Sequence, residues 1–249
     1  MKYELFKSNS NNMHFINRIS LIFFLLILVS TSAQEKILYK QVDATKLYLE
    51  VYKPNKENLQ GNNPAMVFFF GGGWNGGATQ QFKPQAEYFA KRGIVCFLAD
   101  YRVKSRNKTS PFESLKDAKS AVRFVRKNAK KFGIDPNKII GSGGSAGGHL
   151  AAATALVEGY DESSDDISID CRPNALVLFN PVVDNGPAGY GYERVGEAYK
   201  NFSPLHNIKK GAPPTIFFLG TKDKLIPVET AEYYKTAMVR VGSRCHLSL

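Results

Sequence analysis

Cysteine is scarce in this chain of 249 residues, which contains three: Cys96, Cys171 and Cys245. At least one of them is therefore unpaired, and no disulfide framework is implied. The spacing also provides no cluster of ligands for a metal ion. Cys96 lies within a strongly apolar segment, where a buried thiol is the simplest interpretation. We expect no metal centre.

The sequence also lacks an apolar run long enough to span a bilayer as a stable helix. The run from Leu21 to Val29 is short, follows His14 to Arg18, and leads to the small residues Thr31 and Ala33. This pattern is typical of a secretory signal with cleavage before Gln34. We predict a signal peptide over residues 1–33 and a single domain over 34–249. The protein is then secreted, without a stable membrane anchor. The polar residues 1–12 make an unusually long lead, which favours Met13 as the start of translation.

Features of nucleic-acid binding are missing although the net charge is +11. The densest basic group has helical spacing, which indicates a solvated helix face: Arg123, Arg126, Lys127, Lys130 and Lys131. No basic groove interleaved with aromatic residues and no known binding module is visible. We therefore expect no nucleic-acid partner.

Apolar strand segments alternate with helical segments along the chain. Strands are expected at 47–52, 65–70, 94–99, 138–140, 175–179 and 215–219, and helices at 82–91, 111–132, 146–157 and 228–241. Most of these strands are apolar throughout, which is typical of parallel strands buried on both faces. The pattern predicts a three-layer α/β/α sandwich around a mostly parallel sheet, with the last strand and the final helix incomplete. In such sheets ligands bind beyond the carboxyl ends of the strands.

The pentad Gly143-Gly144-Ser145-Ala146-Gly147 stands between a strand segment and an Ala-rich helix segment. This G-x-S-x-G pattern is typical of a nucleophile elbow, a sharp strand-to-helix turn that exposes the serine. Small neighbours are required because side chains there would collide with the adjoining strand and helix. Ser145 is therefore the candidate nucleophile.

A serine nucleophile also needs hydrogen-bond donors for the oxyanion and an acidic residue to orient its base. The glycine run Gly71–Gly73 follows an apolar strand, so we expect the N–H groups of Gly72, Gly73 and Ala146 to form an oxyanion hole. Trp74 adjoins this loop and is a candidate substrate-binding residue. Asp223 follows a later strand, where the acid of a Ser-Asp-His order belongs.

These motifs resemble the α/β-hydrolase superfamily, specifically its secreted esterase and lipase branch. The resemblance rests on Gly71-Gly72-Gly73-Trp74, Asp100-Tyr101-Arg102, the serine pentad with Gly148 and His149, and Gly220-Thr221-Lys222-Asp223. It includes acetyl esterases and carbohydrate esterases that remove acetyl or feruloyl groups from plant polysaccharides. The resemblance implies Ser145 as nucleophile, Asp223 as acid and no cofactor. Phe70 is a departure, since many relatives have histidine there.

Histidine is the scarcest of the required residues, and four are present. His14 lies in the predicted signal. His149 is four residues after Ser145 on the same expected helix, so its side chain points along the helix. His206 lies in the irregular stretch 181–214, and His246 falls near the start of the last strand. The resemblance places the base after that strand, so we expect the chain to lack its general base and to be incomplete at its C-terminus.

The leading hypothesis is a secreted serine esterase acting on a small ester or an acylated polysaccharide, with doubtful activity in this chain. A second hypothesis is a non-catalytic polysaccharide- or ligand-binding protein that retains the pocket. A third is a serine peptidase of the prolyl-oligopeptidase type, although such enzymes usually have a large gating domain, for which this chain has no room.

Overall fold

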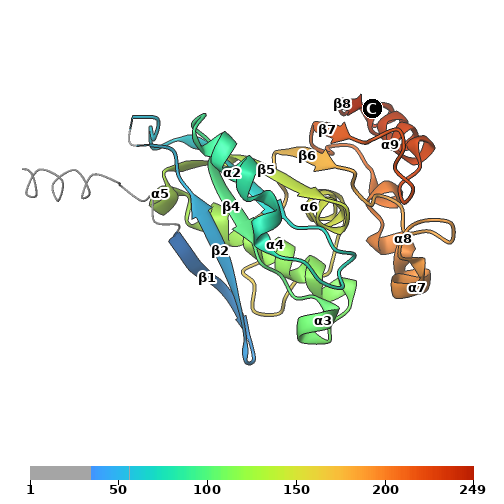
Figure 1. Ribbon diagram of the computed structural model, residues 1–249, viewed down its shortest axis with the longest axis horizontal. Helices are drawn as coiled ribbons and strands as arrows, with labels where there is room; N and C mark the ends of the chain where they lie inside the picture. Colours follow the sequence, from blue (N-terminus) through green and yellow to red (C-terminus); the bar gives the residue numbers. More distant parts are fainter. Residues whose placement is uncertain (1–34, 56) are drawn as a thin grey trace, which may run out of the picture. The chain divides into compact units, whose positions relative to one another are not determined.

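The computed structural model describes residues 35–249 with the exception of residue 56, and the predicted signal peptide lies outside this part. Eight strands form one sheet in the order β1-β2-β4-β3-β5-β6-β7-β8 (Figure 1). The strands are β1 (Glu35–Val42), β2 (Thr45–Tyr52), β3 (Asn63–Phe69), β4 (Val95–Ala99), β5 (Ile134–Gly144), β6 (Ala175–Phe179), β7 (Thr215–Phe218) and β8 (Cys245–Ser248). Strand β2 pairs antiparallel with β1 and β4, and all other pairs are parallel. The predicted mostly parallel sheet is confirmed.

Helices cover both faces of this sheet. They are α2 (Lys83–Ala90), α3 (Lys104–Asn107), α4 (Pro111–Lys127), α5 (Ala129–Phe132), α6 (Ala146–Leu156), α7 (Tyr192–Val195), α8 (Tyr199–Phe202) and α9 (Val228–Arg240), with 3-10 turns η1 (Thr79–Phe82), η2 (Gly196–Ala198) and η3 (Pro204–Asn207). The larger core lies between the sheet and α4, α6 and α9. A smaller core lies on the other face of the sheet, between β3, β4 and α2.

Strand β7 differs from its prediction as a strand buried on both faces. Thr215 and Phe217 are buried, whereas Ile216 and Phe218 are 40% and 38% exposed. Successive side chains of a strand point to opposite faces, and α9 covers only the face of Phe217. Within the described residues, the face opposite α9 is covered by α2 near β3 and β4, and this cover does not extend over β7.

The helix predicted over 111–132 begins as expected and is interrupted near its end. Ser110 accepts a hydrogen bond from the Phe112 N–H while Glu113 accepts from the Ser110 N–H, which completes a capping box. Helix α4 ends at Lys127, and the short α5 runs to the left-handed Gly133. The break falls at Asn128, whose side chain donates to the carbonyl of Phe124 and so competes with regular helical bonding.

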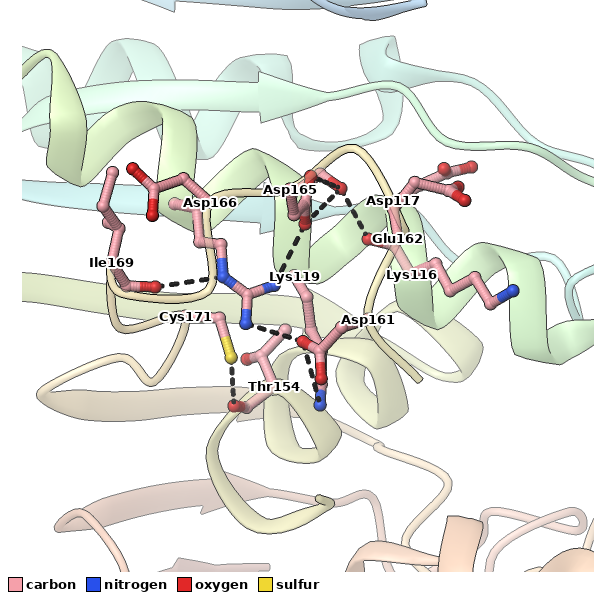
Figure 2. Close-up of polar contacts among 12 residues, drawn as sticks. Lys116, Asp117, Lys119, Thr154, Asp161, Glu162, Asp165, Asp166, Ile169 and Cys171 are labelled. Atoms are coloured by element: carbon pink, nitrogen blue, oxygen red, sulfur yellow. Dashed lines mark hydrogen bonds and ion pairs between the residues drawn. The ribbon is translucent and has the colours of Figure 1, made fainter. Parts of the chain in front are cut away.

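A buried ionic cluster joins α4 to β1, to the segment after β4 and to the loop between α6 and β6. The Asp117 carboxylate is fully buried and accepts hydrogen bonds from Arg102. The Nζ atom of Lys40 lies 2.7 Å from Asp117 Oδ1. Burial opposes the charge of Glu162, but hydrogen bonds and attraction from Lys40 and Arg102 outweigh it and hold the pKa of Glu162 below its ordinary value. Figure 2 shows Asp161 and Asp165 of this loop, which pair with Arg123 of α4.

Removal of the Asp117 carboxylate should destabilise the fold strongly. Asp117→Ala removes the carboxylate that pairs with the buried side chains of Arg102 and Lys40. Breaking a buried ion pair in this way lowers the free energy of unfolding by about 3–5 kcal/mol. Urea unfolding followed by circular dichroism measures the loss against Glu232→Ala, which removes an exposed carboxylate of α9. Equal unfolding free energies for the two variants would contradict a structural role of the cluster.

In the part of the chain that the structure describes, none of the helices combines the length and the apolar character required to cross a membrane.

Candidate active site

Ser145 occupies the turn between β5 and α6, as its pentad predicts. Its backbone has φ 52° and ψ −120°, a conformation that residues other than glycine rarely adopt. The Ser145 N–H donates to the carbonyl of Phe179, and its own carbonyl accepts from His149 and Val182. Strain of this kind persists where the surrounding structure holds the backbone, and it is concentrated at functional sites. The elbow is therefore held from the neighbouring strand β6 as well as from its own helix.

The two outer glycines of the pentad are required by close backbone contacts. A Cβ atom on Gly143 would lie 2.5 Å from the carbonyl of Gly147 and 2.6 Å from that of Phe69. A Cβ atom on Gly147 would overlap the carbonyl oxygens of Phe69 and Phe70. The first turn of α6 thus packs directly on the end of β3. This contact sets the distance between the serine and the loop that follows β3.

The glycine loop after β3 lies beside Ser145. A Cβ atom on Gly71 would stand 3.4 Å from the Cβ atom of Ser145. Gly72 and Gly73 have φ values of 136° and 61°, which favour glycine. Throughout residues 35–249 other than 56, the N–H groups of Gly72, Gly73 and Ala146 donate to no protein acceptor. The predicted donors are thus unpaired in a loop that begins beside the serine, and their role in an oxyanion hole stays a prediction.

Asp223 lies in the loop between β7 and α9, at the carboxyl edge of the sheet. Its Oδ1 atom accepts hydrogen bonds of 2.8 and 3.0 Å from the N–H groups of Leu225 and Ile226. The carboxylate borders a cavity of about 390 Å³ whose wall also includes Phe179. Because Phe179 accepts the N–H of Ser145, this cavity adjoins the serine elbow. Asp223 therefore lies on the wall of a cavity close to the elbow, and its role as the acid stays a prediction.

None of the three described histidines reaches Ser145. His149 is completely buried, and its Nε2 atom lies 3.2 Å from the carbonyl oxygen of Phe202. Burial lowers the pKa of His149 to about 3, so the ring is neutral at physiological pH. His206 borders a cavity with Leu156, at the opposite end of α6 from the serine. His246 pairs in register with Ile216, below the carboxyl edge of the sheet.

This combination of an eight-stranded sheet, a strained serine elbow and a glycine loop agrees with a family comparison. A model of the BD-FAE family matches residues 49–189, which is more than half of the chain. The chain belongs to the BD-FAE family. The matched region includes Ser145 and the glycine loop, whereas Asp223 lies outside it.

Solved structures similar to this BD-FAE chain include an esterase of the α/β-hydrolase fold. Esterase 2 of Thermogutta terrifontis, in a form phosphonylated by sarin, is 43% identical, has a TM-score of 0.83, and covers 88% of this chain and 84% of its own. Its propionate-bound form is 44% identical, with a TM-score of 0.82 and coverages of 88% and 83%. The fold predicted from the sequence is confirmed.

Curated relatives of the BD-FAE chain include esterases. Esterase LipC of Mycobacterium tuberculosis is 29% identical over 69% of this chain and 47% of its own length. An acetylxylan esterase of Xylanibacter ruminicola is 28% identical over 77% of this chain and 40% of its own. The chain thus spans about half the length or less of these relatives.

The sequence did not reveal the residues that hold the glycine loop of this BD-FAE member. The hydroxyl of Tyr101 donates to the carbonyl of Phe70 at 2.6 Å, and Gln81 accepts the N–H of Gly71. Arg194, from α7, donates to the carbonyl of Gly73. Tyr101 belongs to a motif that carried the resemblance, but its partner becomes visible only in three dimensions. Arg194 gave no signal, because it lies 121 residues from Gly73 in an irregular stretch.

Trp74 is packed more deeply than a surface substrate contact. It is 1% exposed, and its ring lies edge-on against His149 at 5.1 Å between centroids. It nevertheless borders a cavity of about 720 Å³ together with Gly72 and Gly73. Trp74 therefore forms part of the floor of a cavity that adjoins the candidate oxyanion donors.

Proposed function

We propose that this chain carries the nucleophile, the oxyanion hole and the acid of a secreted serine carboxylic-ester hydrolase. Its substrates would be short acyl esters of carbohydrates, with acetyl or feruloyl as the acyl group. The observation that carries this proposal is the strained Ser145 next to unpaired N–H groups of the glycine loop. Export by residues 1–33 is part of the proposal.

The chemistry follows from this arrangement. Ser145 Oγ attacks the ester carbonyl and loses its proton, while the N–H groups of Gly72, Gly73 and Ala146 stabilise the negative charge that forms on the carbonyl oxygen. Departure of the alcohol leaves an acyl group on the serine, which water then releases as the acid. Both steps need a base oriented by Asp223.

Two comparisons support the choice of a short acyl group on a carbohydrate. The similar Thermogutta terrifontis esterase 2 has been solved with propionate and with butyrate bound. One curated relative acts as an acetylxylan esterase. The open cavity of about 720 Å³ beside the glycine loop also suits a sugar on the alcohol side of the ester.

The positions of the described histidines lead us to expect a slow reaction in this chain. A positioned base contributes about 10²–10⁴-fold to such reactions. We therefore expect Ser145-dependent hydrolysis of p-nitrophenyl acetate by the 249-residue chain at least about 100-fold below the median turnover number of about 10 s⁻¹ for enzymes. Release of p-nitrophenol by the chain and by Ser145→Ala measures this rate. A turnover number near the median that disappears in Ser145→Ala would show that the chain has a working base.

The same histidine positions favour a second candidate, a non-catalytic protein that binds acylated polysaccharide. In that case the pocket would bind glycans in Ser145→Ala as well as in the parent chain, and Ser145 would form no acyl-enzyme. Detection of an acyl group on Ser145 would exclude this candidate.

A further inference from the structure

The cavity bordered by Gly72, Gly73 and Trp74 has a pronounced positive lining. Lys104 and Lys108, from the segment after β4, border it together with Arg194. Glu193 is the one carboxylate among its lining residues, and it pairs with Arg194 at 3.0 Å. Across residues 35–249 other than 56, neither lysine has an ion-pair partner. The cavity thus presents two uncompensated cations next to the candidate oxyanion hole.

The backbone at Lys108 is strained. Its φ of 59° lies in the left-handed region, which favours glycine or asparagine over residues with a larger side chain. Its N–H donates to the carbonyl of Lys104, which closes the turn of α3. Lysine at this position therefore lowers the free energy of unfolding relative to glycine. The turn itself does not require a lysine side chain. This is consistent with a functional use of its ammonium group.

Two buried polar atoms of residues that border the cavity lack protein partners. The Trp74 Nε1–H group is buried, and an indole N–H can only donate a hydrogen bond. The hydroxyl of Thr109 is likewise buried without a partner among the described residues. Buried polar groups in folded proteins are nearly always hydrogen-bonded, so both atoms are left unsatisfied in this state, and neither is exposed to the cavity itself.

The size and position of the cavity indicate which part of a substrate it receives. At about 720 Å³ it falls within the range of small-molecule sites, and an acetyl group would leave most of it empty. Its wall includes the two glycines whose N–H groups face the reacting carbonyl in the proposed function. A ligand in this cavity would therefore lie beside the glycine loop, and its place on the alcohol side of the ester is part of the inference below.

We infer that this cavity binds an acidic sugar, so that the substrate is an acylated saccharide carrying a carboxylate. This inference rests on the proposed function for the ester bond and goes beyond it in the identity of the alcohol. Lys104 and Lys108 attract the carboxylate. Charge-assisted hydrogen bonds of this kind are about twice as strong as neutral ones.

Equilibrium binding of matched sugars tests the inference without any need for turnover. Methyl glucuronide and methyl glucoside share one ring and differ in the carboxylate. We expect the Ser145→Ala chain to bind the glucuronide at least about tenfold more tightly in isothermal titration, and the preference to decrease as salt is raised. The double variant Lys104→Gln/Lys108→Gln should lose the preference. The control Lys46→Gln/Lys210→Gln, which removes two exposed lysines elsewhere, should retain it.

The outcomes separate this inference from the proposed function. Equal affinities for the two sugars, or a preference that survives Lys104→Gln/Lys108→Gln, would overturn the acidic-sugar assignment even if Ser145 proved to be acylated. A glucuronide preference in a chain whose Ser145 never forms a covalent adduct would support the binding assignment and contradict the esterase proposal. Hydrolysis that favours p-nitrophenyl monosuccinate over the acetate, without glucuronide binding, would place the charge on the acyl side and also overturn it.

Discussion

Free imidazole is expected to accelerate Ser145-dependent hydrolysis of p-nitrophenyl acetate by this chain about tenfold or more. A positioned base contributes about 10²–10⁴-fold, and a diffusing base restores part of this contribution. The cavity of about 390 Å³ that contains Asp223 and adjoins the serine elbow offers it a binding place. The measurement is initial rate against imidazole concentration near pH 7.5, where most of the imidazole is neutral.

Two variants distinguish rescue at the site from general buffer catalysis. Ser145→Ala should show only the background reaction of imidazole with the ester. Asp223→Asn should retain the serine but respond less to imidazole, because the carboxylate that orients and stabilises the protonated ring is gone. An identical imidazole response in the parent chain and in Ser145→Ala would contradict a site that lacks only its base.

Replacement of Gly147 by alanine is expected to impair both the fold and the site. The added Cβ atom would overlap the carbonyl oxygens of Phe69 and Phe70, so the end of β3 must move away from α6. Overpacking of this kind costs about 1–3 kcal/mol. The movement displaces the glycine loop from Ser145, and loss of one oxyanion donor alone costs about 10²–10³-fold in rate. Urea unfolding and the rate of Ser145 acylation measure the two effects.

Gly220→Ala is the matched control for this substitution. Nothing lies within 4 Å of a Cβ atom at Gly220, and its backbone is outside the left-handed region. The free energy of unfolding of Gly220→Ala should therefore remain within about 0.5 kcal/mol of that of the parent chain. If Gly147→Ala acylates Ser145 as fast as Gly220→Ala does, the contact between α6 and β3 does not position the oxyanion loop.

The elements of this fold that depend on local signals were predictable from the sequence. The capping box of Ser110 and Glu113 marked the start of α4, and the apolar run 175–179 coincides with β6. These two elements were predictable because each depends on residues that are close together in the sequence. The serine elbow was predictable from its pentad motif, although Gly147 is required by the distant carbonyls of Phe69 and Phe70.

Features that depend on distant residues were not predictable. The exposure of Ile216 and Phe218 depends on which helix covers a strand, and the apolar composition of that strand does not contain this information. Arg194 reaches the glycine loop from α7, 121 residues away in the sequence. Lys104 and Lys108 look like ordinary surface lysines until the cavity beside Trp74 is seen.

Mass spectrometry of the chain after treatment with a fluorophosphonate ester tests the central claim most directly. A phosphonate bonds covalently to an activated serine, and the similar Thermogutta terrifontis esterase 2 has been solved phosphonylated by sarin. We expect one adduct per chain, on the peptide that contains Ser145, formed faster with imidazole and absent from Ser145→Ala. An adduct on another residue, or none with imidazole present, would contradict the assignment of Ser145 as the nucleophile of an esterase.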